Sequence, residues 1–321
     1  MSFRGHLWTV APLVRHYLRR TRFPASRPWE TALEDPRMGT VRLSGWPREA
    51  PESGEVLVLV HGLGGGTESR YLGGGVAAAE AAGISSLRIN LRGSDRRGED
   101  FYHAGLTADL HAALASEELR RYERVYVLGY SLGGHLTLRL GAEAGDPRLA
   151  AVAALCAPLD LAVSQREIDS LLRWPYRRYL LKGLVDIYAA VAARRPVPLP
   201  VEQARRIRTI REWDDRVVAP RHGFADAADY YARESVAPRL PGLRVPALLL
   251  ASEADPMVPA HTVRAALDAL PRPAPRLEVR WVAVGGHDSF PRALEVDRRV
   301  VEWLREQKIR VEAPPAARPA G

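Results

Sequence analysis

The sequence has little lysine, one cysteine and no long apolar run. Of the 46 lysines and arginines in its 321 residues, only Lys182 and Lys308 are lysines. The single cysteine, Cys156, excludes an internal disulfide framework and any metal site built from several cysteines. The central stretch 125–138 has no charged residue, but it is too short for a transmembrane helix and contains Gly, Ser and His. We therefore predict no membrane-spanning segment.

The composition is that of a globular protein with a basic surface. Hydrophobic residues make up 46% of the chain and charged residues 26%, which excludes a disordered or fibrous protein. The net charge of +8 is compatible with an anionic partner, but a bias toward arginine explains it equally well. No nucleic-acid-binding module with basic residues interleaved among stacking aromatics is present, so no nucleic-acid partner is expected.

The two ends of the chain differ from its middle. Apolar residues at helical spacing in 7–18, with arginines opposite, predict an amphipathic helix that packs on the body of the protein. The alternative is peripheral contact with an anionic membrane through this helix or the cap. The short apolar stretch lacks a cleavage site, so we expect no signal peptide and a cytoplasmic protein. The proline- and alanine-rich tail 311–321 is predicted to be disordered.

Between these ends, short apolar runs alternate with segments of helical periodicity. The runs are rich in Val, Ile and Leu and occupy 56–60, 84–90, 125–128, 151–155, 245–250 and 277–284. Nearly continuous apolar runs indicate strands buried on both faces, as in a parallel sheet. The intervening segments 70–82, 107–122, 132–144, 259–270 and 291–307 are predicted helices. This alternation predicts an α/β domain with a doubly wound, mostly parallel sheet.

One interval breaks the alternation. Residues 161–240 contain no strong strand pattern but many aromatic residues, and they are too numerous for a simple connection. We predict a helical cap over the carboxyl ends of the strands, with an additional packing layer as the alternative. The predicted organisation is then an N-terminal segment, 1–50, that packs on a core formed by 51–160 and 241–310, with the cap inserted between the two parts of the core.

A nucleophile is predicted where the apolar run 125–128 enters Gly129-Tyr130-Ser131-Leu132-Gly133. This is the G-x-S-x-G pattern between a strand and a helix. Glycines are needed because side chains at 129 and 133 would clash in a turn sharp enough to place Ser131 at its apex. The helix N-terminus that follows favours developing negative charge.

The run 56–60 ends in a glycine-rich loop, 61–66. Acyl transfer creates an oxyanion that two fixed backbone N–H groups stabilise, and we assign these to Leu63 and Leu132. His61 could be a base, but its place at a strand end favours a role in holding this loop. A phosphate-binding loop is disfavoured because no Gly-Lys-Ser/Thr follows.

The serine requires a base, and the base requires an acid that fixes its tautomer. In this fold class the acid and then the base follow the serine along the chain. Asp255 follows the run 245–250 and is the predicted acid, with Glu253 as the rival. His287 follows the run 277–284 in a glycine-containing loop and is the predicted base.

Other chemistry-bearing residues are assigned structural roles. Arg92, at a strand end, is predicted to form a structural ion pair rather than to bind an anion. Asp214 and Asp215 lack histidine partners for a metal and are expected to anchor the cap to Arg216 or Arg221. No metal and no cofactor are expected. Cys156, directly after an apolar run, is predicted to be an inert buried thiol.

These motifs resemble those of the α/β-hydrolase superfamily. The resemblance is carried by 61–65, 90–93, 129–134 and 285–287. Segments 211–215, 228–231 and 234–235, with 5–9 near the start, resemble more narrowly the YheT-like group of esterases, and the likeness extends from Gly5 to Glu306. It implies the α/β-hydrolase fold, a Ser131–Asp255–His287 triad, Leu63 and Leu132 as the oxyanion hole, and small-molecule carboxylic esters or acylglycerols as substrates without a cofactor.

The sequence thus predicts a serine hydrolase that cleaves an acyl ester through an acyl-enzyme. Two alternatives remain at this point. An acyltransferase would use the same triad and pass the acyl group to an alcohol. A non-catalytic binding protein would keep the fold, but the Ser, Asp and His in their expected places argue against it.

Overall fold

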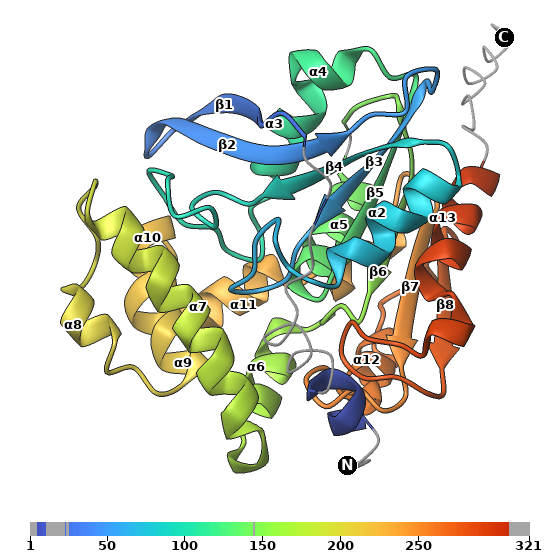
Figure 1. Cartoon of the computed structure of the whole chain (residues 1–321). Coiled ribbons are helices and arrows are strands. Elements are labelled where there is room, and N and C mark those ends of the chain that lie inside the picture. Colours follow the sequence, from blue (N-terminus) through green and yellow to red (C-terminus); the bar gives the residue numbers. More distant parts are fainter. Residues whose placement is uncertain (1–4, 11–22, 24–25, 144, 308–321) are drawn as a thin grey trace, which may run out of the picture.

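The computed structural model describes residues 5–10, 23, 26–143 and 145–307. Eight strands form one sheet in the order β1-β2-β4-β3-β5-β6-β7-β8 (Figure 1). The strands are β1 (Trp29–Asp35), β2 (Gly39–Arg48), β3 (Glu55–Val60), β4 (Ser85–Asn90), β5 (Arg124–Tyr130), β6 (Leu149–Leu155), β7 (Ala247–Ser252) and β8 (Leu277–Val282). Pairing is parallel from β4 through β3 to β8, whereas β2 pairs antiparallel with both β1 and β4.

The six strands predicted from apolar runs are all present. β4, β6 and β7 are buried along their whole length, which is why their sequences show no alternation of polar and apolar residues. β8, at the edge of the sheet, alternates between half-buried and exposed residues. The β1–β2 hairpin is not among the predicted strands and extends the other edge of the sheet.

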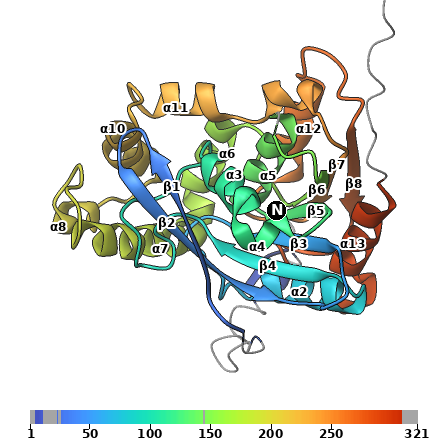
Figure 2. The ribbon, with the colours of Figure 1, turned by 90° about the horizontal axis from the view of Figure 1, so that it is seen from above.

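Helices cover both faces of the sheet, as a doubly wound fold requires. Successive residues of β3 contribute to different cores, with Val58 on one side and Leu59 on the other. The Leu59 side is covered by α2 (Leu72–Ala81) and α13 (Val296–Glu306), which lie side by side (Figure 2). The Val58 side is covered by α3 (Ala108–Ala115), α4 (Glu117–Arg120), α5 (Leu132–Ala142) and α12 (Ala260–Asp268). The five predicted helical segments are therefore confirmed, with the short η4 (Arg292–Leu294) before α13.

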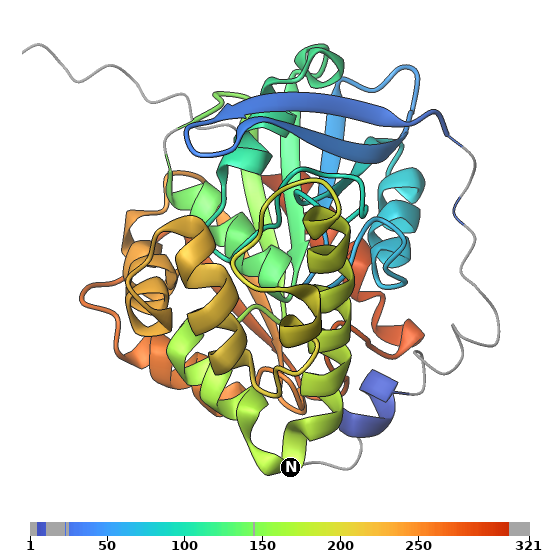
Figure 3. The ribbon, with the colours of Figure 1, turned by 90° about the vertical axis from the view of Figure 1, so that its left-hand side faces the viewer.

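The chain between β6 and β7 is helical. Its elements are α6 (Leu161–Asp169), η1 (Leu171–Arg173), α7 (Trp174–Ala192), α8 (Val201–Ala204), α9 (Ile210–Trp213), the π-helical turn η2 (Asp214–Val218), α10 (Ala219–His222), α11 (Ala227–Glu234) and η3 (Ala237–Gly242). Figure 3 shows these helices gathered in front of one end of the sheet. We refer to residues 161–240 as the cap segment.

The N-terminal helix is described only in part. Residues 5–10 are helical, and the remainder of the predicted helix 7–18 lies outside the described residues, as does the tail 311–321. The side chains of Leu7 and Val10 are 55% and 41% exposed, so the expected packing of this apolar face on the body is wrong for these two residues.

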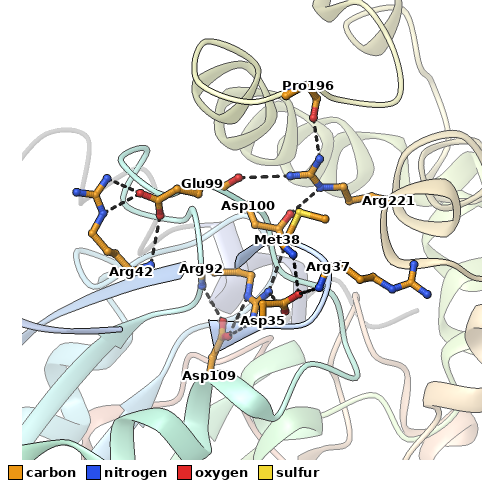
Figure 4. A network of polar contacts seen from close by, with 10 residues as sticks. All are labelled: Asp35, Arg37, Met38, Arg42, Arg92, Glu99, Asp100, Asp109, Pro196 and Arg221. Atoms are coloured by element: carbon orange, nitrogen blue, oxygen red, sulfur yellow. Dashed lines mark hydrogen bonds and ion pairs between the residues drawn. The ribbon is translucent and has the colours of Figure 1, made fainter. Parts of the chain in front are cut away.

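Arg92 joins several elements through a buried ion network (Figure 4). Its Nη2 and Nε donate to Oδ1 of Asp109 on α3 over 2.7 and 2.9 Å. Its Nη1 donates to Asp35 at the end of β1 and to Asp100 in the loop after β4. Arg221 of α10 donates to the other oxygen of Asp100, which ties the cap segment to the core. The structural role predicted for Arg92 is confirmed.

No helix among the described residues is both long enough and apolar enough to cross a membrane.

Candidate active site

Ser131 occupies a sharp turn between β5 and α5. Its backbone has φ 52° and ψ −120°, an uncommon conformation for a residue with a side chain, which costs about 1–3 kcal/mol. A Cβ on Gly129 would lie 2.2 Å from the carbonyl oxygen of Gly133, and a Cβ on Gly133 would lie 2.4 Å from that of Val60. The predicted need for glycine at both positions is therefore confirmed.

His61 holds the loop that follows β3. Its Nε2 accepts a hydrogen bond from the N–H of Leu91 over 3.2 Å and lies 3.0 Å from Oγ of Ser94. Because Nε2 is the acceptor, the proton is on Nδ1, which donates to the carbonyl oxygen of Gly62 over 2.8 Å. Complete burial lowers the pKa of His61 to about 4, so the ring is neutral. The predicted loop-holding role is confirmed.

Two backbone N–H groups lie close to Ser131. Leu132 is the first residue of α5, where N–H groups have no partner within the helix. Leu63 belongs to the loop held by His61, and both leucines line the same cavity as Ser131. Among the described residues, no acceptor takes the N–H of either leucine. These two N–H groups can therefore donate hydrogen bonds to an oxygen bound beside Ser131.

Asp255 and His287 come together from the loops after β7 and β8. Nδ1 of His287 donates to Oδ2 of Asp255 over 2.8 Å, and both side chains are buried. The other oxygen of Asp255 accepts from the N–H groups of Met257 and Val258, at 2.7 and 2.9 Å. This leaves the carboxylate no freedom to turn and fixes the ring through Nδ1.

The rival acid, Glu253, does not reach the histidine. Its carboxylate pairs with Arg264 at the surface, where the side chain is 36% exposed. The turn at Asp255-Pro256 directs the acid at 255 inward and the one at 253 outward. Of the two candidates, the structure therefore places only Asp255 against His287.

A second carboxylate, Asp288, lies beside the other ring nitrogen of His287. Its Oδ2 is 3.4 Å from Nε2, and its Oδ1 is buried without a hydrogen-bond partner. Burial alone would lower the pKa of His287, but the charges of Asp255 and Asp288 outweigh it and raise that pKa to about 9. Asp288 was not among the predicted site residues, because its place next to His287 in the sequence does not indicate which ring nitrogen its side chain approaches.

The helical residues 5–10 support the His287 loop, a contact that the sequence did not indicate. The N–H of His287 donates to Oγ1 of Thr9 over 2.9 Å, and Thr9 in turn donates to the carbonyl oxygen of Gly5. His6 stacks on Tyr176 of α7, with Nδ1 2.7 Å from the tyrosine oxygen. The N-terminal residues thus connect the His287 loop to the cap segment.

Ser131 and His287 face one cavity of about 110 Å³ between the core and the cap segment. Its apolar wall includes Leu161, Ile168, Leu180, Leu184, Trp213 and Met257. No hydrogen bond joins Ser131 to His287 within the described part of the chain. The cavity can hold an apolar group next to the serine hydroxyl.

The cap carboxylates make other contacts than expected. Asp214 lines the cavity and accepts a hydrogen bond from the hydroxyl of Tyr231 over 2.6 Å. Asp215 pairs with Arg211, one turn earlier. The predicted anchoring to Arg216 or Arg221 is therefore wrong. The reason is helical spacing: Arg216 is adjacent to Asp215 and pairs instead with Glu212, four residues before it.

One group of potential metal ligands occurs among the described residues. Donor atoms of Cys156, His287 and Asp288 lie within 4.8 Å of one another. Burial raises the pKa of the Cys156 thiol well above its usual value, and that of His287 is also raised, so both groups retain protons that a metal would have to displace. The chemistry of this group fits a metal poorly, and the buried thiol has the inert environment predicted for it.

The sequence matches a known protein family. The model of the "Alpha/beta hydrolase family" matches residues 57–302 of the chain. The chain belongs to the α/β-hydrolase family. It is 32% identical to the protein named "Putative esterase YheT" of Escherichia coli (strain K12), over 93% of this chain and 89% of that protein. The YheT-like resemblance read from the motifs is thus confirmed.

More distant α/β hydrolases share parts of the sequence or only the fold. A monoacylglycerol lipase of Saccharomyces cerevisiae is 26% identical over 63% of this chain, which spans about half (48%) of the lipase. The structure of the Pyrococcus furiosus esterase Pf2001 superimposes with a TM-score of 0.56 at 16% identity, covering 88% of this chain and 93% of the esterase. The mostly parallel sheet and its helical layers are therefore those of this family.

Proposed function

We propose that this protein is a serine hydrolase of carboxylic esters, with Ser131 as nucleophile, His287 as base and Asp255 as the acid that orients it. The observation that carries the proposal is the placement of Ser131 on a strained turn, facing the same cavity as a histidine whose Nδ1 is held by a buried carboxylate. Membership of the family and the relatives named esterase and lipase support ester hydrolysis.

In the proposed reaction, Oγ of Ser131 attacks the ester carbonyl carbon while Nε2 of neutral His287 takes the hydroxyl proton. The negative oxygen that forms accepts hydrogen bonds from the N–H groups of Leu63 and Leu132. The bond to the alcohol oxygen then breaks, and the alcohol leaves with the proton from His287. Water repeats the sequence: His287 takes a proton from water, hydroxide adds to the acyl carbon, and Ser131 regains its proton as the acid leaves.

The cavity indicates where the acyl group binds. Its wall is mainly apolar and comes largely from the cap segment, so an acyl chain placed there is shielded from water. Acylglycerols and other acyl esters fit this environment. A series of esters of graded acyl length would give the preferred substrate, and assays with added alcohol acceptors would separate hydrolysis from acyl transfer.

Labelling with a fluorophosphonate tests the nucleophile. We expect the wild-type protein to be modified at Ser131, the Ser131→Ala variant to remain unmodified, and its esterase activity to fall by several orders of magnitude. Ser53→Ala, in a turn before β3, is the matched control and should label like the wild type. A folded wild-type protein that is not labelled, or label on another serine, would refute the assignment.

We further propose that the enzyme docks peripherally on anionic phospholipid bilayers. Leu171, Leu172 and Trp174, on η1 and the start of α7, are 87%, 72% and 54% exposed. The helical residues 5–10, which carry the exposed Leu7 and Val10, are joined to α7 by the contact between His6 and Tyr176 and lie beside α7 in Figure 3. We call these five side chains the interfacial patch. Such clusters of exposed large apolar residues mark interaction surfaces.

The charges around the interfacial patch support an anionic membrane as the partner. Arg166, Arg178 and Lys182 are exposed on α6 and α7, the two helices that flank η1. Cations beside exposed leucine and tryptophan side chains suit the headgroup region of an anionic membrane, where basic residues meet phosphates and apolar ones enter the acyl boundary. A bilayer held there would present lipid esters to the cap side of the cavity.

Sedimentation with vesicles tests the docking surface. The wild type should pellet with vesicles that contain phosphatidylserine and much less with phosphatidylcholine alone. The double variant Leu171→Glu, Leu172→Glu should lose most of this binding but retain activity on a water-soluble ester. Arg272→Glu, at an exposed remote loop, lowers the net charge by the same two units and should still bind. Equal binding by the double variant and this control would refute the surface.

A further inference from the structure

The ring of His287 lies between two buried carboxylates. Asp255 approaches Nδ1 at 2.8 Å, and Asp288 approaches Nε2 at 3.4 Å. The side chains of Asp255 and Asp288 are 1% and 4% exposed. In the proposed reaction Nε2 takes the proton of Ser131. A carboxylate beside Nε2 therefore affects this first proton transfer.

The two carboxylates are held very differently. Both oxygens of Asp255 have hydrogen-bond partners, as described above. Asp288 has Oδ1 buried without a partner, and among the described residues its carboxylate forms an ion pair only with Nε2 of His287, at 3.4 Å. The backbone of Asp288 has φ 51°, in the left-handed region that few residues other than glycine adopt. A strained residue with an unsatisfied oxygen is not explained by packing.

The groups around Asp288 offer it no other strong partner. Asp297 of α13 accepts from the hydroxyl of Tyr130, and the hydroxyl of Tyr71 accepts from Gly62. The remaining titratable groups that face the Asp288–His287 pair are Arg70, Cys156 and Asp255. Arg70 is the one cation among these groups apart from His287 itself, and no ion pair joins it to Asp288 within the described residues.

We propose that Asp288 is a positioning residue that holds Nε2 of His287 in the resting enzyme and competes with Ser131 for it. The missing hydrogen bond between Ser131 and His287 in the described part of the chain agrees with this competition. The proposal rests on the proposed triad, because it concerns the base of that reaction. Asp288 thereby sets the pH at which the base becomes free.

The direction of the effect follows from the charges. Burial raises the pKa of Asp288 to about 7, and its negative charge, with that of Asp255, raises the pKa of His287 to about 9. A histidine with a raised pKa is largely protonated at neutral pH and cannot accept the serine proton until it loses its own. Removing the Asp288 charge must therefore lower the pKa of the base and make it available at lower pH.

The test is the pH profile of kcat/KM, whose acid limb reports the base of the free enzyme. In Asp288→Asn the acid limb should move down by about 1 pH unit, so kcat/KM at pH 8, where Asp288 of the wild type is ionised, rises about fivefold while the plateau at high pH stays within about twofold. Asp288→Glu, which restores a carboxylate, should return the limb toward the wild-type position. A purely structural role would lower activity at every pH without moving the limb.

Asp297→Asn is the matched control, since it removes a half-buried carboxylate of the same neighbourhood that does not contact the ring, and it should shift the limb less. Asp288→Ser repeats the test if the amide does not fold. An acid limb that stays in place in a folded Asp288→Asn protein overturns the inference. If Ser131→Ala is inactive and the acid limb of Asp288→Asn stays in place, only the role proposed for Asp288 is refuted. If Ser131→Ala retains full activity, the proposed triad itself is refuted.

Discussion

A buried cation is paired with carboxylates both around Arg92 and around His287, and these two clusters differ in the nature of the cation. In the first, Arg92 is fully buried among Asp35, Asp100 and Asp109. In the second, His287 lies between Asp255 and Asp288. A guanidinium stays charged at any pH the protein meets, whereas an imidazole can lose its proton near neutrality.

The two clusters also differ in how many of their polar atoms have hydrogen-bond partners. Arg92 donates to three carboxylates through all three of its nitrogens and also from its backbone N–H to Asp109. Its neighbours raise its pKa further, so the pairing is permanent. In the other cluster one carboxylate oxygen of Asp288 has no partner and the cation is titratable. A fixed charge suits a joint between elements, and a movable proton suits a reaction.

The largest expected effect comes from removing the acid in the histidine cluster. Asp255→Asn cannot stabilise the imidazolium and favours the wrong tautomer, so kcat should fall by about 10⁴-fold. The corresponding change in the arginine cluster, Asp35→Asn, should leave kcat within about twofold of the wild-type value. Steady-state kinetics on a soluble ester measure both. A loss of less than tenfold in Asp255→Asn would mean that the two clusters do not differ in function as proposed.

The second effect concerns stability. Arg92→Met leaves Asp109 buried without its cation and Asp100 with Arg221 alone, which should lower the free energy of unfolding by about 3–5 kcal/mol. Urea unfolding measures this loss, and residual folded protein should keep its specific activity. The exposed pair Arg205–Glu202 is the control: Arg205→Met should cost less than about 1 kcal/mol. Equal costs at the two sites would contradict the structural role of the buried cluster.

The sequence predicts those features that depend on short segments. The turn at Ser131 follows from five consecutive residues. The strands β3 to β8 follow from nearly continuous apolar runs, which are typical of strands buried on both faces of a sheet. The β1–β2 hairpin was not predicted because β2 contains Gly45 and Pro47, and both residue types argue against a strand. They are tolerated here because β2 lies near the edge of the sheet. Its pairing is visible only in three dimensions.

The site was predictable only in outline. Chain order and strand ends single out Asp255 and His287, and the structure brings them to 2.8 Å. The approach of Asp288 to Nε2 and the support from Thr9 depend on loop conformations that no local pattern records. The cap contact of Asp214 was assigned to the wrong partners because its partner Tyr231 lies on a separate helix, α11.

Asp214 offers a third case, a buried carboxyl group that forms no ion pair with a cation among the residues that the structure describes. Burial raises the pKa of Asp214 to about 7. The hydrogen bond from the hydroxyl of Tyr231 stabilises the ionised carboxylate but offsets only part of this rise. Because the folded-state pKa lies above the unfolded value of 3.8, ionisation of Asp214 costs stability as the pH rises from about 4 to 7. An asparagine at this position keeps an acceptor for Tyr231 and never ionises.

The smallest expected effect is therefore the pH dependence of Asp214→Asn. Its free energy of unfolding relative to the wild type should improve by about 1 kcal/mol between pH 6 and pH 8.5, the equivalent of roughly one pKa unit. Urea unfolding at the two pH values measures the difference, and Asp215→Asn, on a half-exposed carboxylate that pairs with Arg211, should show no such improvement. If Asp214→Asn is equally affected at both pH values, Asp214 is ionised throughout, and a buried carboxylate in this protein does not need a cation. The contrast between the arginine and histidine clusters would then rest on the proton of His287 alone.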